Sequence, residues 1–139
     1  MTAGGGPGGR PTLVVDGNNV IGSVPDGWWR DRPAAVRRLL ARLRCLAATP
    51  GAPAAVLVLD VPQPDLPEGV HGEVAVHYAR RRGRDAADDR IVDLLDAAAA
   101  GDAIEVVTSD RDLAARAADR GARVTGAGAF LDALDRAGC

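Results

Sequence analysis

Aspartate follows three apolar segments that have the composition of buried strands. Asp16 comes directly after LVV, Asp60 directly after AAVLVL, and Asp110 directly after EVVTS. The carboxyl ends of parallel strands meet at one edge of a sheet, so we expect these carboxylates to lie close together. Grouped carboxylates repel one another and need protons or a hard cation. Oxygen ligands without a neighbouring His or Cys favour Mg²⁺ or Mn²⁺ over zinc.

Three further aspartates begin the helical segment RDAADDRIVDLL. With Ile91 on the face toward the sheet, Asp88 lies about 60° from it around the helix, at the edge of that face. Asp89 lies about 160° from Ile91 and should point outward. Asp88 is therefore the better candidate for a metal ligand. Asp85 has an alternative role as the N-cap of this helix, with Asp88 as its capping partner.

The acids near the later motif divide between capping and chemistry. Ser109 is predicted to cap the helix that follows it, with Asp112 as its partner. This leaves Asp110 at the first helical position, without a capping role and available for a site. Asp16 has its own alternative as a turn former, because Asp-Gly is a common turn dipeptide. Its coincidence with Asp88 and Asp110 favours the site.

Segments of strand and helix character alternate along the chain, which predicts βαβ units and a mostly parallel sheet of about five strands. The expected strands cover 12–15, 54–59, 73–77, 103–108 and 122–126, and the expected helices cover 33–47, 84–101, 109–121 and 127–138. A chain of 139 residues has the length of one domain. We assign residues 12–139 to it and expect the Gly/Pro-rich residues 1–11 to be a disordered leader.

Several classes of protein are excluded by composition. No apolar stretch approaches the ~18 residues of a membrane span, and residues 1–11 lack the apolar region of a signal peptide. Cys45 lies within an expected helix and Cys139 ends the chain, so we expect no structural disulfide, a reducing compartment and a cytoplasmic protein. The chain has no lysine, and its GGGPGG run is not a P-loop, which argues against receiver and nucleotide-triphosphate domains.

Basic residues are concentrated directly before the acidic helix. The net charge of −2 excludes a protein whose whole surface attracts nucleic acid, so such binding has to be local. The segment YARRRGRD supplies four candidate phosphate contacts: Arg80, Arg81, Arg82 and Arg84. The alternative is a solvated arginine turn.

The remaining aromatic and histidine residues receive structural interpretations. Trp28 and Trp29 lie in the loop PDGWWRDRP, where one of them could stack on an unpaired base. Packing at a core edge or in a dimer contact is the favoured alternative. His71 and His77 are also expected to be structural.

Three motifs of this chain together resemble a known family. DGNNVIG after the first strand, ADDRIVDLL in the middle helix and TSDRDLA after a later strand resemble the motifs of NYN-domain proteins, in the PIN-like nuclease group, and most of all its YacP-like branch. The resemblance runs from about Thr12 to Asp135. It implies a three-layer α/β/α (Rossmann-like) domain with metal-dependent endoribonuclease activity on RNA.

The resemblance also implies roles for individual residues. Asp16 would be a metal-binding acid that Asn19 helps to order, Asp88 with Asp89 would be the acids of the middle motif, and Asp110 that of the third. Asp60 is a looser match. Some relatives carry a further acid where this chain has Leu113 and Ala114, and Asp112 is the nearest substitute. The number of metal ions, one or two, therefore stays open.

Together these observations predict metal-assisted hydrolysis of RNA phosphodiester bonds. Asp16, Asp88 and Asp110 would hold Mg²⁺ or Mn²⁺, and the arginines would hold the polyanion. The alternative is a catalytically weak NYN-fold domain that binds RNA or a partner protein. The oligomeric state is left open, with a dimer as one option.

Overall fold

The structure is a computed structural model of the 139-residue chain, and it describes residues 11–83, 85–99 and 101–139. Only Pro11 of the expected leader falls within these residues. The disorder of that leader and the domain boundary at residue 12 therefore stay predictions. Arg84 also lies outside the described residues.

The described strands form one mixed sheet of six strands, in the order β3-β4-β2-β1-β5-β6. Neighbouring strands are parallel except for β3 and β4, which are antiparallel. The strands are β1 (Thr12–Asp16), β2 (Ala54–Leu59), β3 (Gly69–His71), β4 (Val74–Tyr78), β5 (Ile104–Val107) and β6 (Arg123–Thr125). The mostly parallel sheet is confirmed. The sequence analysis missed β3, a three-residue edge strand too short and too exposed to show apolar periodicity.

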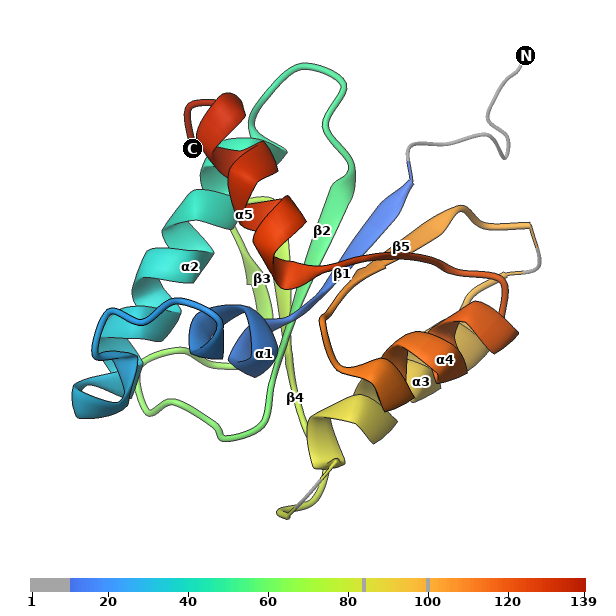
Figure 1. The fold of residues 1–139 in the computed structure, drawn as a ribbon, viewed down its shortest axis with the longest axis horizontal. Coiled ribbons are helices and arrows are strands. Elements are labelled where there is room, and N and C mark those ends of the chain that lie inside the picture. The colour runs from blue at the N-terminus through green and yellow to red at the C-terminus, as the bar shows by residue number, and fades with distance from the viewer. Residues whose placement is uncertain (1–10, 84, 100) are drawn as a thin grey trace.

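Helices cover both faces of this sheet, which makes the three-layer α/β/α arrangement seen in Figure 1. The helices are α1 (Gly17–Gly22), the 3₁₀ turn η2 (Trp28–Arg30), α2 (Arg32–Ala47), α3 (Ala86–Ala97), α4 (Arg111–Asp119) and α5 (Ala127–Arg136). Helices α1, α2 and α5 lie on one face, and α3 and α4 lie on the other. The expected fold class is therefore confirmed.

Two hydrophobic cores, one on each face, hold the layers together. Leu13 and Val15 of β1 pack in the core that contains the buried faces of α2 and α5. Val14 points to the opposite face and packs with Ile91 of α3 and Leu113 of α4. The central strand is buried on both sides, which explains why it reads as a continuous apolar run.

Helix α1 begins where the sequence analysis expected a turn. Gly17 follows β1 directly and is buried under β2. A Cβ atom at this position would lie 2.7 Å from Leu59 Cδ2, 2.8 Å from Leu57 Cδ1 and 3.0 Å from the Val58 carbonyl oxygen. The glycine is thus required by close packing rather than by turn geometry.

A disulfide joins Cys45 of α2 to Cys139, so the expectation of no structural disulfide is wrong. The two cysteines are 94 residues apart in sequence, but α5 runs beside α2 and returns the chain end to it. Arg42 strengthens the contact by donating from Nε to the Cys139 carbonyl, at 2.9 Å, and by pairing with Asp135. The cysteines therefore no longer support a reducing compartment, since cytosolic proteins rarely contain disulfides.

Candidate functional site

A hollow of about 290 Å³ opens at the carboxyl ends of the central strands, beside the start of α3. We call it the acid hollow. Its polar lining comes from four separate segments of the chain: Asp16, Asn18, Asn19, Asp60, Asp85, Asp88 and Asp110. The strand-end acids and Asp88 are brought together as the sequence predicted, because β2, β1 and β5 are neighbours in the sheet.

Asp16 lies at the floor of the acid hollow, at the end of β1, and is only 4% exposed. Burial raises the pKa of its carboxyl group to about 6 from a normal value of 3.8. The Thr108 hydroxyl, which donates to Asp16 Oδ2 at 2.8 Å, and the backbone amide of Asn19 oppose the shift. The negative charges of Asp110 and Asp60 add to it.

Asp88 faces the same hollow from the first turn of α3 and is 8% exposed. Its pKa is also raised to about 6, first by burial and then by the negative charges of Asp16, Asp110 and Asp85. The positive charge of Arg116 on α4 partly opposes this rise. Two buried carboxyl groups from distant segments thus have raised pKa values in one hollow, and a proton or a cation would neutralise their charge.

Asp110 caps α4, which corrects the expected assignment of this role to Ser109. Asp110 Oδ1 accepts a hydrogen bond from the Leu113 backbone N–H at 3.0 Å, and its own N–H donates to Thr108 Oγ1 at 3.1 Å. Ser109 instead accepts from the Ala127 N–H at 2.9 Å, because the loop before α5 passes beside it. Asp110 therefore serves the helix and lines the hollow at the same time.

Asn18 and Asn19 hold together the three loops that form the hollow. Asn18 Oδ1 accepts from the Asp60 backbone N–H at 2.8 Å, and Asn19 Oδ1 accepts from the Ser109 N–H at 2.7 Å. The sequence analysis expected Asn19 to help order Asp16, and the backbone N–H of Asn19 hydrogen-bonds to the Asp16 carboxylate. The side-chain amides of Asn18 and Asn19 connect α1 to the ends of β2 and β5, and so position the other acids indirectly.

The other predicted acids differ in their relation to the acid hollow. Asp60 lies at its rim and forms an ion pair with Arg32 at 3.6 Å. Asp85 occupies the N-cap position of α3 with a left-handed backbone, φ 62°, and its side chain makes no capping bond. Asp112 is exposed on the first turn of α4 and does not line the hollow.

Asp89 points away from the acid hollow, as the helical arithmetic predicted. It accepts hydrogen bonds from Arg81 at 2.6 Å and from Arg116 at 3.1 Å. These two bonds hold the pKa of Asp89 below its usual value. The structure therefore does not place Asp89 with the other acids of the hollow. Its carboxylate binds Arg81 and Arg116 on the other side of α3 instead.

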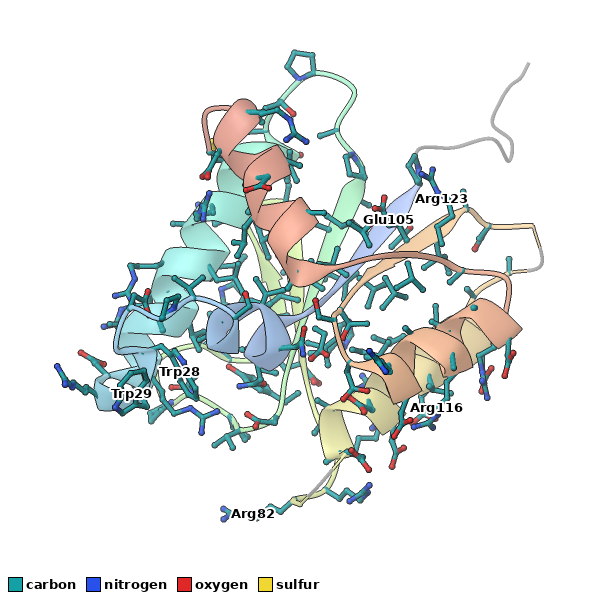
Figure 2. The ribbon with its side chains drawn as sticks, viewed as in Figure 1. Trp28, Trp29, Arg82, Glu105, Arg116 and Arg123 are labelled. Atoms are coloured by element: carbon teal, nitrogen blue, oxygen red, sulfur yellow. A yellow bond between two sulfur atoms is a disulfide. The ribbon has the colours of Figure 1, made fainter. Side chains whose placement is uncertain are left out.

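The predicted arginines separate in space. Arg80 and Arg81 line a second hollow of about 350 Å³, together with Asp89 and three residues that the sequence analysis missed, Arg90, Asp93 and Arg116. We call it the arginine hollow. Figure 2 shows Arg82 at the far end of its loop, away from the helices. Arg84 lies outside the described residues.

Sequence reasoning missed Thr108, which contacts Asp16 beside the acid hollow, and three residues that line the arginine hollow, Arg90, Asp93 and Arg116. Thr108 is close in sequence to Asp110, and that adjacency was its only available signal. Arg90 and Arg116 gave none, because an arginine within a helix usually belongs to a solvated face.

The donors in the acid hollow suit a hard divalent cation. They are all oxygen atoms, and the raised pKa values show that their negative charge is poorly compensated. Within the part of the chain that the structure describes, no three His, Cys, Asp or Glu residues form a ready-made metal-binding group. Mg²⁺ commonly binds through one or two carboxylates and retains several waters, so such a group is not required. The residues present therefore fit Mg²⁺ or Mn²⁺.

Fold and site together define a PIN-like α/β/α domain with an acidic hollow at the carboxyl edge of its sheet. The model of the YacP-like NYN domain matches residues 13–138, and the chain belongs to that family of nuclease-like domains. No curated protein is significantly similar to the chain in sequence.

Two solved structures have the same fold. The crystal structure of Rae1 (YacP) from Bacillus subtilis superposes with a TM-score of 0.76 at 23% identity, over 92% of this chain and 75% of that one. Its W164L mutant gives 0.75 at 22% identity, over 92% and 77%. At these identities the likeness establishes the fold alone.

Proposed function

We propose that this protein is a divalent-metal-dependent endoribonuclease that hydrolyses RNA phosphodiester bonds at the acid hollow. One observation carries the proposal: Asp16 and Asp88, from separate segments, are buried in one hollow, where burial raises the pKa of both and neighbouring acids raise it further. Membership of a nuclease-like family supports it.

In this proposal, Asp16, Asp88 and Asp110 hold Mg²⁺ or Mn²⁺, with Asp60 and Asp85 at the rim. Bound there, the ion would supply a polarised phosphoryl oxygen and an activated water. The Thr108 hydroxyl donates to the Asp16 carboxylate and accepts from the Asp110 backbone N–H, so it links Asp16 to the start of α4.

A histidine acid or base is not part of the proposal. His71 Nε2 contacts the Pro67 carbonyl oxygen, and His77 Nδ1 accepts from Arg90, so both rings make structural contacts. Neither lines the acid hollow. Proton transfer would therefore pass to water rather than to a side chain of these residues.

RNA as the substrate is supported by the arginines beside the acid hollow, since guanidinium groups bind phosphate in a fork geometry. The tryptophans contribute less. Trp28 stacks edge-on with Trp29 and lies under Arg32, outside both hollows. Figure 2 shows both tryptophans at the α2 end of the molecule.

One observation favours the alternative, an NYN-fold domain that binds RNA or a partner protein with weak catalysis. The described acids do not form a closed metal-binding group without rearrangement. In that case the acid hollow would bind a cation loosely and the arginines would carry the function.

In the described part of the chain, no helix is both long and apolar enough to cross a membrane. The cytoplasmic location that the sequence analysis expected stays a prediction, and the disulfide of Cys45 and Cys139 argues against it.

The test is cleavage of an end-labelled single-stranded RNA by the purified protein in Mn²⁺ and in Mg²⁺. EDTA and Asp16→Asn should both abolish cutting, and Asp132→Asn, at an exposed position of α5, should leave it unchanged. Cutting that survives either EDTA or Asp16→Asn would refute the proposed site. If no RNA is cut but Mn²⁺ raises the melting temperature of the wild type and not of Asp16→Asn, the alternative is favoured.

A further inference from the structure

The arginine hollow collects positive charge in an acidic protein. Four arginines and two aspartates line it: Arg80, Arg81, Arg90, Arg116, Asp89 and Asp93. The lining thus has two positive charges in excess, while the whole chain carries −2. The residues come from the loop after β4, from α3 and from α4, so the hollow depends on the tertiary fold.

Arg90 is the buried member of this group, with 8% of its surface exposed. Its guanidinium donates from one terminal nitrogen to His77 Nδ1 at 2.9 Å. Burial and the charge of Arg90 lower the pKa of His77, which keeps the imidazole a neutral acceptor. Nε of Arg90 is buried and has no hydrogen-bond partner in the structure.

A buried guanidinium with an unused donor is costly, and buried charges in proteins are normally paired. Among the residues that the structure describes, neither Arg80 nor Arg90 has a carboxylate within ion-pair distance. Arg81 and Arg116 share the single carboxylate of Asp89. Glu68 interacts with the charges of Arg80 and Arg90 from beyond ion-pair distance. Within the described chain, no carboxylate is therefore in direct contact with the buried guanidinium, which favours an anionic ligand.

The arginine hollow adjoins the acid hollow. Ala86, in the first turn of α3, lines both of them. On that same turn Asp88 faces the acid hollow and Asp89 faces the arginines. Figure 2 shows Arg116 on α4, where it lies beside α3. A polyanion whose reacting phosphate lay at Asp88 would place a neighbouring phosphate against the arginines.

We propose that the arginine hollow is a phosphate subsite, in which Arg90, Arg80 and Arg116 bind a backbone phosphate adjacent to the one that is hydrolysed. The inference rests on the proposed function and extends it to residues outside the acid hollow. The Arg90 fork is directed by its bond to His77, and Asp89 holds Arg81 and Arg116 beside it. Guanidinium recognition of phosphate needs no metal, so this subsite should bind RNA without any divalent ion.

The experiment is metal-free RNA binding, which does not depend on catalysis. Fluorescence anisotropy of a labelled 12-nucleotide single-stranded RNA is measured in EDTA over a series of KCl concentrations. Arg116→Ala, Arg80→Ala and Arg90→Lys are compared with Arg120→Ala. Arg120 is the matched control because it lies one turn further along α4, pairs with Asp96 of α3 and is outside the hollow.

We expect Arg116→Ala and Arg80→Ala each to weaken binding by about tenfold and to reduce the slope of log K against log salt by about 0.7, the value of one lost phosphate contact on a single strand. Arg90→Lys, which keeps the charge but removes the fork and Nε, should also weaken binding. Arg120→Ala should bind like the wild type. Thermal melts of each variant identify any that fails to fold.

Three outcomes overturn the subsite: a wild type that does not bind this RNA in EDTA, hollow variants with wild-type affinity and slope, or an Arg120→Ala variant as weak as Arg116→Ala. Cleavage in Mn²⁺ separates this failure from failure of the proposed function. Metal-free binding with the expected losses but no cleavage would retain the subsite and reject the nuclease. Cleavage by the wild type, together with unchanged RNA binding in Arg116→Ala and Arg80→Ala, would retain the nuclease and reject the subsite.

Discussion

Replacing Asp16 by asparagine should stabilise the metal-free protein at neutral pH. The Asp16 carboxyl group has a pKa of about 6 in the folded state and a normal value of 3.8. At about 1.36 kcal/mol per pKa unit, the ionised form costs the folded state about 3 kcal/mol. An asparagine carries no charge, and its Oδ1 can still accept from the Thr108 hydroxyl.

The sign of the effect depends on pH. Well below pH 3.8 Asp16 is protonated in both the folded and the unfolded state, so the variant and the wild type should be equally stable there, and at pH 4 the difference should be only about 0.5 kcal/mol. Because the folded pKa is raised, the wild type loses stability as pH rises from 3.8 toward 6, and the loss is complete above that value. The variant should therefore gain about 3 kcal/mol at pH 8, which is roughly 10 °C in melting temperature for a domain of this size.

Urea unfolding in EDTA at pH 4 and pH 8 measures both values. Asp132→Asn, at an exposed position of α5, reports the effect of removing one negative charge from the surface. Added Mn²⁺ should stabilise the wild type and leave Asp16→Asn unchanged. A variant less stable than the wild type at pH 8, or a difference that is the same at both pH values, would refute the argument that burial penalises this carboxylate.

Three other predictions concern Gly17, Cys45 and Asp110. Gly17→Ala should cost about 1–3 kcal/mol in urea unfolding because its Cβ has no room, whereas Gly128→Ala, whose Cβ meets open space, should be neutral or stabilising by up to about 1 kcal/mol. Cys45→Ser should destabilise by up to about 4.7 kcal/mol, the chain-entropy value for a loop of this length, and should make stability insensitive to dithiothreitol, unlike that of the wild type. Asp110→Ala should lower the free energy of unfolding by about 1 kcal/mol because it removes the cap of α4, whereas Asp110→Ser should keep the cap. Both variants should stop RNA cleavage. Cleavage by Asp110→Ser would exclude a catalytic role for Asp110.

Local signals were enough to predict most elements of the fold. The buried strands are apolar on both faces, so β1, β2 and β5 read as continuous runs, and α2 shows a clear helical period. Helical geometry also separated Asp88 from Asp89 correctly, because the direction of a side chain on a helix follows from its position alone. The edge strand β3 was missed because pairing with β4, rather than its own composition, makes it a strand.

Partners that come from distant parts of the chain could not be predicted in this way. Asp110, rather than the expected Ser109, caps α4, because the serine hydroxyl accepts from the Ala127 N–H in the loop before α5. The pairing of Cys45 with Cys139 depends on α5 returning to α2. The pKa of Asp16 depends on burial and on acids from other segments.

The sequence by itself determined which acids follow the strands and the order of the elements that present them. Apolar periodicity specifies strands and helices, and acids at strand ends specify one edge of the sheet. Only the tertiary structure decided that Asp88 shares a hollow with Asp16 while Asp89 turns to a second hollow lined by arginines. The physical reason is that charge, burial and hydrogen bonding depend on distances in space, and packing sets these distances between residues far apart in the chain.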